Sequence, residues 1–578
     1  MSASTASRGT GRTDGIDLLP RYRSLEEHTS CYFVVGNGSA RRPPGVSTLT
    51  TVSRATLREV TGSGRVDAEV PPVVDASRAN VADLVTEAAA RVPRHAALVD
   101  QPTGRSLTWR HVDTAVTAFA GTLLETGLVP GDRVAIVLPN GPEFAVALFG
   151  VLRAGGVAVP VGTHLPPAEL TRVLTDSGAS VLVGAGADTG AYDTGTILAP
   201  PDLDAVPEVE PTADAPRGGE DVAVLCYTSG TAGSPRGVML SHRALLSNVE
   251  QCAALRPAPV TATDRVLLVV PLFHAYGLGP GLLQVAAAGA TAVLMETFGV
   301  EPALDACAGY RVTALVGVPA MYQAFAEVPA DRLAEALSTV RLLTSGAAPL
   351  PPPVLTAIQR ATGLHVFEGY GLAETGPVLT STLVGGLAKP GSVGRPLPGV
   401  ELVLVDSDGR PVGAAPEEDE PGWFDDDAAS ETGRVAARGP NLFSGYWPDG
   451  AHGPDADGWF TTGDVGYLDA DGDLHLVDRA NDLIIVNGFN VYPNEVERVL
   501  GELPEVAESA AVGVPDERTG ELVKAVIVLA PGASLTEDAV REHCAERLAR
   551  FKVPSAVEFV DALPYGVTGK VRRASLRG

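Results

Sequence analysis

A chain of 578 residues is too long for one hydrophobic core, and ordinary domain sizes predict roughly three or four structural units. Apolar residues make up 45% of the sequence and charged residues 20%, which excludes disorder throughout, and 64 Gly with 46 Pro predict many turns. The 43 basic and 70 acidic side chains leave a net charge of −27, which argues against non-specific attraction to nucleic acid or to an anionic membrane.

The cysteines and the apolar runs exclude further classes of protein. The five cysteines, Cys31, Cys226, Cys252, Cys307 and Cys544, show no CxxC or Cys/His spacing, which argues against a zinc site and against a disulfide framework. No apolar run reaches the roughly 18 residues of a membrane span, and the polar N-terminus has no signal-peptide core. We therefore expect a cytoplasmic protein without a membrane span.

In chain order, residues 1–75 show little periodicity and predict a flexible extension. From Asn80 the stretches NVADLVTEAAAR and LTWRHVDTAVTAFAGTLLETG have the apolar spacing of helices. Residues 132–161 then place Val/Ala-rich runs on both sides of an amphipathic stretch, which predicts a strand, a helix and a parallel strand. Similar runs recur in RVLLVVPL, TAVLME, VTALVGVP and VRLLTSG, and they predict a large sheet covered by helices.

The later part of the chain changes in character. The insert 417–428 is rich in acidic residues and is too polar for a core, so we expect a solvated loop. After Asp478 the pattern predicts a separate module with a helix near 537–549. The predicted fold is α/β, with a large multi-layered domain of parallel-rich sheets over 76–478 and a small mobile α+β domain over 479–578.

One segment carries a candidate phosphate site. A predicted strand over Val222–Cys226 runs into a stretch of Thr, Ser, Gly and Pro that ends at Arg236. Such a loop can point backbone N–H groups and hydroxyls at phosphate oxygens, and Arg236 adds a positive charge. The stretch does not match GxxxxGK[ST], so it is not a P-loop of that kind.

Five segments in this order resemble the signatures of the adenylate-forming superfamily, which includes acyl-CoA synthetases, adenylation domains and luciferases. They are YTSGTAGSPRGV, SGAAPL, FEGYGLAETGP, the long stretch from FTTGDVGYLDADGDLHLVDR to NGFNVYPNEVE, and LPYGVTGKVRR. The resemblance covers roughly residues 80–578. It implies that ATP activates a carboxylic acid as an acyl-adenylate with release of pyrophosphate, and that the acyl group then passes to a thiol, with coenzyme A expected as the acceptor.

The resemblance also implies residue roles. Around the phosphates it places Thr228, Ser229, Gly230, Thr231, Gly233 and Arg236, with Thr375 at the α-phosphate and Glu374 on Mg²⁺, a cation that suits carboxylate and phosphate oxygens. For the rest of ATP it implies Gly346, Ala347, Glu368, Tyr370 and Gly371 in the adenine motifs, with Tyr370 stacked on the base, and Asp464 and Arg479 at the ribose.

Three further residues are implied by resemblance. Lys570 would present its ammonium group to the α-phosphate and the carboxylate, a role for which a point charge suffices. His274 would gate the passage between the acyl pocket and the thiol channel, unless it is an ordinary core histidine. Gly488 would line the thiol channel. Arg236 stands where lysine is usual, Asp478 where glycine is usual, and Asn481 at the hinge, which leaves the hinge equilibrium open.

The substrate stays open among several alternatives. The sequence favours a fatty acid first, then an aryl or unusual small acid, and transfer to an acyl carrier protein in place of CoA third. Two further alternatives are an adenylating enzyme with a nitrogen-based substrate and a non-catalytic relative. The intact Glu374, Asp464, Arg479 and Lys570 argue against the last. The oligomeric state is not indicated by any pattern.

Overall fold

The structure is a computed structural model that describes residues 79–577, except for 185–194, 205–216, 229–235, 407, 413–431, 480–481, 483, 487–488, 517 and 566–570. Several predictions therefore lie outside the described residues: the extension 1–75, the acidic insert 417–428, and Ser229, Gly230, Thr231, Gly233, Asn481, Gly488 and Lys570. The side chains of Asp478 and Arg479 also lie outside them.

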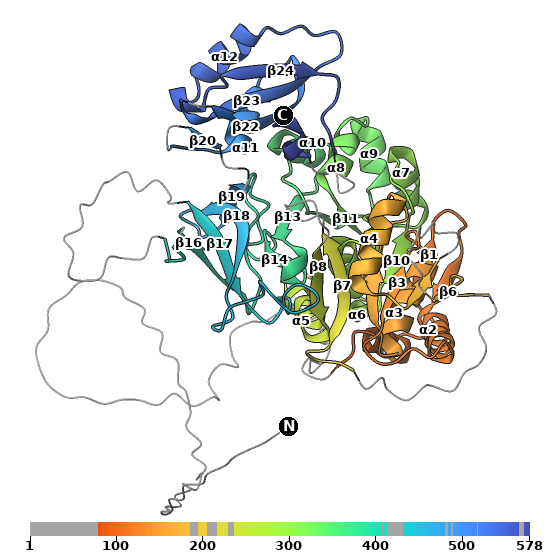
Figure 1. The fold of residues 1–578 in the computed structure, drawn as a ribbon. Helices are drawn as coiled ribbons and strands as arrows, with labels where there is room; N and C mark the ends of the chain where they lie inside the picture. The colour runs from red at the N-terminus through yellow and green to blue at the C-terminus, as the bar shows by residue number, and fades with distance from the viewer. Residues whose placement is uncertain are drawn as a thin grey trace, which may run out of the picture. The chain divides into compact units, whose positions relative to one another are not determined.

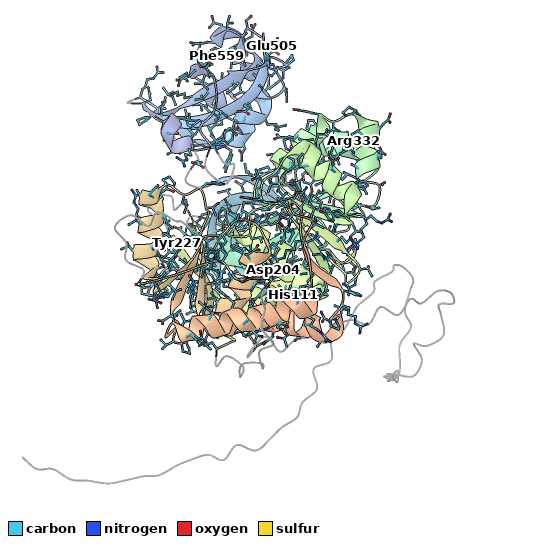
Figure 2. All side chains as sticks on the ribbon, turned by 90° about the vertical axis from the view of Figure 1, so that its right-hand side faces the viewer. His111, Asp204, Tyr227, Arg332, Glu505 and Phe559 are labelled. Atoms are coloured by element: carbon cyan, nitrogen blue, oxygen red, sulfur yellow. The ribbon has the colours of Figure 1, made fainter. Side chains whose placement is uncertain are left out.

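The first predicted elements are confirmed. Helix α1 spans Asp83–Arg91, strand β1 Ala96–Asp100 and helix α2 Trp109–Glu125. Helix α2 begins where the Thr108 hydroxyl accepts a hydrogen bond from the His111 N–H, which satisfies one of the free donors at a helix start. The His111 ring in turn lies 2.9 Å from the Leu203 carbonyl oxygen, so α2 is tied to the segment that carries Asp204 (Figure 2).

The predicted strand–helix–strand unit belongs to a six-stranded sheet in the order β6-β5-β3-β4-β7-β8. Its strands β3 and β4 pair in parallel, as predicted. Only β7 and β8 are antiparallel neighbours. The strands are β3 (Arg133–Ile136), β4 (Val157–Pro160), β5 (Val181–Val183), β6 (Thr196–Leu198), β7 (Val222–Thr228) and β8 (Arg236–Ser241).

The later apolar runs form a second sheet, so the single large sheet suggested by the sequence is divided in two. Nine strands follow the order β15-β14-β13-β12-β11-β9-β10-β1-β2, and its six central strands, β13 to β1, are parallel. The strands after β1 are β2 (Ser106–Thr108), β9 (Arg265–Leu268), β10 (Thr291–Leu294), β11 (Ala314–Gly317), β12 (Leu342–Ser345), β13 (Val366–Gly371), β14 (Val378–Ser381) and β15 (Arg395–Pro396).

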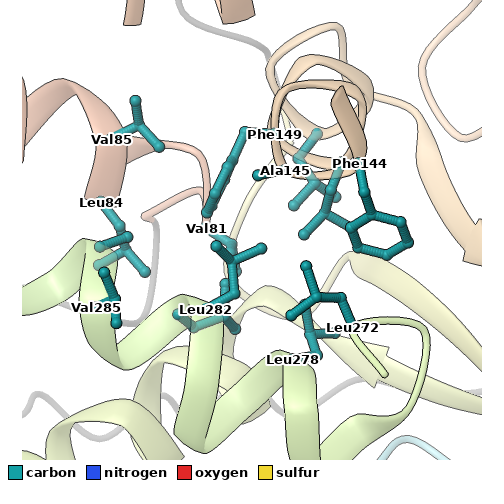
Figure 3. Close-up of a cluster of buried hydrophobic side chains, with 14 of the residues drawn as sticks. Val81, Leu84, Val85, Phe144, Ala145, Phe149, Leu272, Leu278, Leu282 and Val285 are labelled. Carbon is teal, nitrogen blue, oxygen red and sulfur yellow. The ribbon is translucent and has the colours of Figure 1, made fainter. Parts of the chain in front are cut away.

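Helix α3 (Pro142–Arg153) is apolar on all sides and buried along nearly its whole length, as expected of a helix enclosed by other layers. Figure 3 shows Phe144 and Phe149 of α3 in one buried cluster with Val85 of α1 and Leu282 of the helix that follows Tyr276. The other helices of this part are α4 (Pro167–Ser177), α5 (His242–Ala253), the π-helix η1 (Gly277–Leu283), α6 (Gln284–Ala288), α7 (Val300–Gly309), α8 (Pro319–Ala326), α9 (Ala330–Ala336), α10 (Pro352–Thr362) and the 3₁₀ turn η2 (Ala373–Thr375).

Two smaller sheets complete the described fold. An antiparallel sheet contains β16 (Glu401–Val405), β17 (Gly433–Arg438), β18 (Phe460–Leu468) and β19 (Leu474–Arg479). The C-terminal module has β20 (Ile484–Val486), β21 (Phe489–Val491), β22 (Val506–Asp516), β23 (Gly520–Leu529) and β24 (Ala556–Val560), packed against α11 (Pro493–Leu500) and α12 (Glu537–Ala545) (Figure 1). Short 3₁₀ turns η3 (Arg550–Lys552) and η4 (Arg573–Leu576) follow. The predicted α/β class is confirmed.

Candidate active site

A cavity of about 1550 Å³ is lined mainly by residues of the large domain, where the carboxyl ends of several parallel strands meet, and also by Asp482 and residues within 571–577. Strands β11, β12 and β13 each contribute to its wall, and so do the facing ends of β7 and β8. The sequence-predicted residues on its lining are Thr228, Arg236, His274, Gly346, Ala347, Tyr370, Gly371, Glu374 and Asp464. Residues that are far apart in the chain are thus gathered at one place.

Tyr446, which no sequence motif indicated, holds the carboxylate of Glu374. Tyr446 donates its hydroxyl hydrogen to Glu374 Oε1 at 2.7 Å, across a separation of 72 positions. Burial, reinforced by the negative charge of Glu374, raises the pKa of Tyr446 above its usual range. The tyrosine therefore stays protonated and acts as a fixed hydrogen-bond donor to the carboxylate.

Backbone pairing brings Tyr446 to this position. Tyr446 forms an isolated bridge with Val238 of β8, and the Trp447 N–H donates to the Gly237 carbonyl oxygen at 2.8 Å. The segment therefore runs beside β8, and the Arg236 guanidinium lies 4.9 Å from the centre of the Tyr446 ring. This geometry is a cation–π contact, and it keeps a positive charge beside the Glu374 carboxylate.

The ends of the predicted phosphate loop face the cavity. Thr228 and Arg236 are opposite each other in the β7–β8 pairing, and both line the cavity. The predicted strand over Val222–Cys226 is confirmed and extends to Thr228.

Tyr370 and Asp464 are joined directly. The Tyr370 hydroxyl donates to Asp464 Oδ2 at 2.7 Å, and the Asp464 N–H donates to Thr462 Oγ1 at 3.2 Å. In the register of β18 and β19, Asp464 is paired with Arg479, so the backbone puts the two residues predicted for the ribose side by side. A tyrosine ring at the wall is thereby tied to a carboxylate that can accept hydroxyl hydrogens.

Gly346 and Ala347 form a tight turn after β12. A Cβ atom on Gly346 would lie 2.8 Å from Cζ of Tyr276, so the Tyr276 ring covers the place where a side chain would be. Ala347 has φ of +70°, a left-handed conformation that is uncommon for a residue other than glycine. The turn is therefore close-packed on one side and presents its backbone to the cavity.

Two predicted site residues do not lie on the cavity wall. Thr375 is fully buried, and its hydroxyl hydrogen-bonds the carbonyl oxygens of Pro377 at 2.6 Å and Leu372 at 3.1 Å. Glu368 is also buried and does not line the cavity, whereas its neighbours Phe367 and Gly369 on β13 do. The structure does not support Thr375 at the α-phosphate or Glu368 as a direct ATP contact.

His274 and two cysteines also line the cavity. His274 Nδ1 accepts from the Tyr276 N–H at 3.4 Å, so the ring is oriented by the chain that leads into η1. Burial raises the pKa of Cys226 and of Cys252 to about 12. Both thiols stay protonated at neutral pH, which argues against cysteine nucleophiles.

One group of acidic side chains outside the cavity, within the part of the chain that the structure describes, has a metal-like arrangement. Asp469, Asp471 and Asp473 gather in the turn between β18 and β19. The ammonium group of Lys389 contacts all three carboxylates, at 2.9 Å from Asp471 and 3.6 Å from Asp473. The lysine offsets part of the negative charge, and the group forms an internal ion-pair network.

The arrangement suits chemistry on an anionic phosphate ester. One carboxylate, one guanidinium and the ends of a hairpin loop surround a space that is bounded by backbone turns and aromatic rings. Cations and N–H donors around such a space stabilise negative charge that develops on phosphoryl oxygens. None of the helices in the described part of the chain has the length and hydropathy that crossing a membrane requires.

Comparison with known proteins supports the same conclusion. Residues 85–447 match the family model of AMP-binding enzymes, and residues 495–570 match that of the AMP-binding enzyme C-terminal domain. A feruloyl-CoA synthase from Amycolatopsis sp. is 39% identical over 496 residues, which is 84% of this chain and 96% of the relative. A long-chain-fatty-acid–CoA ligase from Bacillus subtilis is 31% identical and covers 88% of this chain and 96% of its own.

Solved structures agree with the fold. The ATP-bound MatB from Rhodopseudomonas palustris is 32% identical and superposes with a TM-score of 0.77 over 86% of this chain and 98% of that chain. The predicted resemblance to adenylate-forming enzymes is confirmed. This chain belongs to the AMP-binding enzyme family, and within that family it is an AMP-forming acid–CoA ligase.

Proposed function

We propose that the acid activated by this enzyme is an aryl carboxylic acid of the feruloyl type, which is adenylated with ATP and transferred to CoA. The observation that carries the proposal is the 39% identity to feruloyl-CoA synthase over 96% of that protein, against 31% to the fatty-acid ligase from Bacillus subtilis. The sequence alone favoured a fatty acid, and the comparison reverses that order.

The cavity wall supports an aryl acid. It combines the rings of Phe273, Tyr276 and Phe367 with the side chain of Gln284, which is only 3% exposed. The Tyr276 hydroxyl is also buried at this wall. An aromatic acyl group packs against such rings, and oxygen substituents on it suit polar groups in the wall better than a plain alkyl chain does.

A fatty acid stays the second candidate, because fatty-acid ligases from several bacteria are 31–33% identical to this chain. An acyl carrier protein as acceptor and a nitrogen-based substrate are further alternatives that the acid panel described below separates. They receive no support from the described residues of the cavity.

For the adenylation step we propose the following roles. Arg236 and the loop from Thr228 hold the phosphates, Tyr370 and the turn at Gly346 bound the base, and Asp464 accepts the ribose hydroxyls, with Arg479 beside it. The Tyr370–Asp464 hydrogen bond of 2.7 Å supports this, since it fixes the carboxylate before ATP arrives.

Magnesium is expected at Glu374. The group fits the ion, because a single carboxylate at a phosphate site is a common protein ligand of Mg²⁺ and Glu374 lies on the cavity. Its Oε1 is oriented by Tyr446. When bound, the ion would neutralise charge on the phosphate oxygens. The chain's own contribution is to hold the carboxylate in place through the hydroxyl of Tyr446, whose ring lies under the guanidinium of Arg236.

We also propose, from the resemblance, that Lys570 serves the adenylation half-reaction and Gly488 the thiol channel, with His274 between the acyl and thiol compartments. The position of His274 on the cavity lining is compatible with its role.

The test is a panel of acids offered to the purified enzyme with ATP and Mg²⁺, with and without CoA. The panel contains hydroxylated and methoxylated cinnamic acids, benzoic acids and fatty acids, and the readouts are pyrophosphate release and product mass. We expect the substituted cinnamic acids to give thioesters with kcat/KM at least about tenfold above any fatty acid. The reverse ranking would overturn the aryl assignment in favour of fatty acids. Pyrophosphate release without any CoA thioester would instead point to a different acceptor.

A further inference from the structure

The turn at Gly346 and Ala347 is fixed at its start by contacts on two sides. The Gly346 N–H donates to the carbonyl oxygen of Gly317 at 3.3 Å, which continues the pairing of β11 with β12. The ring of Tyr276 covers Gly346 from the other side. The chain then leaves the sheet through the left-handed Ala347, so its further course depends on what holds the far end.

The far end is held by Glu368. The Leu350 N–H donates to Glu368 Oε2 at 3.1 Å, and both residues are at least 95% buried. Leu350 is the last residue of the SGAAPL segment, so this hydrogen bond closes the turn against β13. Glu368 is itself held firmly, because its N–H donates to Thr382 Oγ1 and its carbonyl oxygen accepts from the Thr382 N–H, both at 2.9 Å.

Only one of the two carboxylate oxygens of Glu368 has a hydrogen-bond partner among the described residues. Its Oε1 and the hydroxyl of Ser345, its registered neighbour on β12, are both buried, and neither has a hydrogen-bond partner among the described residues. Such groups are costly in a folded protein and are kept where they define geometry. The SGAAPL turn is thus anchored by a buried polar pair that belongs to two adjacent strands.

We propose that Glu368 is a positioning residue for ATP: through the Leu350 N–H it holds the 346–350 turn in the shape that receives the nucleotide, with Ser345 as its buried neighbour. Glu368 itself touches no substrate. The inference rests on the proposed role of Gly346 and Ala347 in nucleotide binding, and it assigns to Glu368 an indirect function in place of the direct contact that the sequence suggested.

Three substitutions separate the reach of the side chain from its charge. Glu368→Gln keeps the side-chain length and an acceptor oxygen for the Leu350 N–H. Glu368→Asp keeps the carboxylate, but the side chain is one methylene shorter, so the acceptor no longer reaches the Leu350 N–H. Glu368→Ala removes the acceptor. We expect Gln to bind ATP as the wild type does, and Asp and Ala to raise the Kd and the KM for ATP by about tenfold, the effect of losing one hydrogen bond to a charged group. Because the chemistry is untouched, kcat at saturating ATP should change less than about threefold, and the KM for the acid should not change.

The matched control is Asp264→Asn, which alters another buried carboxylate. Asp264 is 3% exposed and accepts from Arg341 Nε at 2.9 Å, outside the cavity lining. This variant should lose stability in a thermal melt without changing ATP affinity. The control thereby separates a general loss of stability from a change in the shape of the 346–350 turn. If the Glu368→Ala variant does not fold, the comparison of Glu368→Gln with Glu368→Asp still tests the proposal.

ATP affinity is measured by equilibrium titration of the full chain without any acid, so the result does not depend on which acid is the substrate. The proposal is overturned if Asp behaves like the wild type while Gln behaves like Ala, because charge and not reach would then matter. The proposal is also overturned if all three Glu368 variants bind ATP with the wild-type affinity, or if the KM for the acid changes while the affinity for ATP does not. Failure of the wild-type chain to bind ATP would overturn the nucleotide assignment as well.

Discussion

The two carboxylates of the FEGYGLAETGP segment are six positions apart and have opposite surroundings. Glu374 faces the cavity and accepts a hydrogen bond from Tyr446, whereas Glu368 is buried, and burial raises its pKa to about 7. One side chain faces the cavity, where cations and phosphates would bind, and the other is partly protonated at neutral pH. At the scale of residues, environment rather than residue type sets the role of each carboxylate.

Tyr446→Phe tests the hydrogen bond that orients the Glu374 carboxylate. Removing the hydroxyl leaves the ring under Arg236 in place but takes away the hydrogen bond to the carboxylate, so we expect kcat/KM for adenylation to fall by about tenfold. The Mg²⁺ concentration for half-maximal rate should rise in this variant and rise further in Glu374→Gln, while acid binding changes little. Magnesium titrations of pyrophosphate release measure both effects, and an unchanged magnesium dependence in both variants would remove Glu374 from the metal site.

Glu368→Gln should change how stability depends on pH. Because the pKa of Glu368 is about 7 in the folded chain and 4.5 in the unfolded one, the folded state binds more protons between these values. The stability that Glu368 contributes is therefore complete below about pH 4.5 and is lost as the pH rises through 7. The Gln variant has no such loss, so its stability relative to the wild type should increase from pH 5 to pH 8 by on the order of 2 kcal/mol. Urea unfolding at several pH values checks this, and a pH-independent difference would contradict it.

At the scale of elements, the π-helix η1 brings two loops into close contact. Its sequence GLGPGLL places glycines where the helix touches neighbouring backbone, and π-helical turns often occur at functional sites. A Cβ on Gly279 would lie 2.5 Å from Cδ of Pro377, which closes the turn that carries Glu374. The position of Glu374 thus depends on the absence of a side chain in a helix nearly a hundred residues earlier in the chain.

Gly279→Ala should therefore displace Pro377 and the turn before it. We expect kcat/KM to fall by about tenfold or more together with a loss of stability of roughly 1–3 kcal/mol, as in other overpacked sites. Gly121→Ala on α2 is the control, because nothing lies within 4 Å of the added Cβ. That variant should be as stable as the wild type or slightly more so, since alanine is the better helix former. Full activity in the Gly279 variant would show that the turn tolerates the shift.

At the scale of the whole molecule, the catalytic family signatures begin well after the N-terminus. The AMP-binding match starts at residue 85, and the boundaries 1–75, 76–478 and 479–578 stand as our proposal for the domains. Removing residues 1–70 should leave adenylation within about threefold of the full chain, because that part of the sequence shows little apolar periodicity and precedes both family matches. A loss greater than about tenfold in a folded, truncated chain would show that this part contributes to the site.

The two half-reactions should be separable by substitutions in the C-terminal module. Lys570→Ala should lower adenylate formation by about 10²–10³-fold, the usual effect of removing one preorganised charge, yet still convert a pre-made acyl-adenylate to the thioester. Gly488→Leu should form the adenylate and stall at transfer, because a side chain would obstruct the thiol channel. Single-turnover assays of each step measure this. Equal loss of the same half-reaction in both variants would argue against two poses of the module, and Asn481 at the hinge would be the next residue to test.

Local patterns in the sequence were sufficient for the elements and the family. The apolar periods of α1, α2 and the β3–α3–β4 unit are properties of short segments, and the ordered motifs identified the family because each motif is continuous in the chain. The burial of Glu368 could not be read from the alternation of β13, because Tyr370 has the same parity as Glu368 and nevertheless lines the cavity.

Tertiary structure alone decided which side chains meet. The strands form two sheets because strand order is set by packing between layers, which no local period encodes. Tyr446 reaches Glu374 only through the pairing of its segment with β8, and Tyr276 covers Gly346 only because the chain just before η1 comes to lie at the end of β12. The sequence by itself therefore determined the family and its chemistry and predicted candidate site residues. The orientation of each carboxylate and the partners that hold it depend on contacts between distant segments, which form only when the whole core is packed.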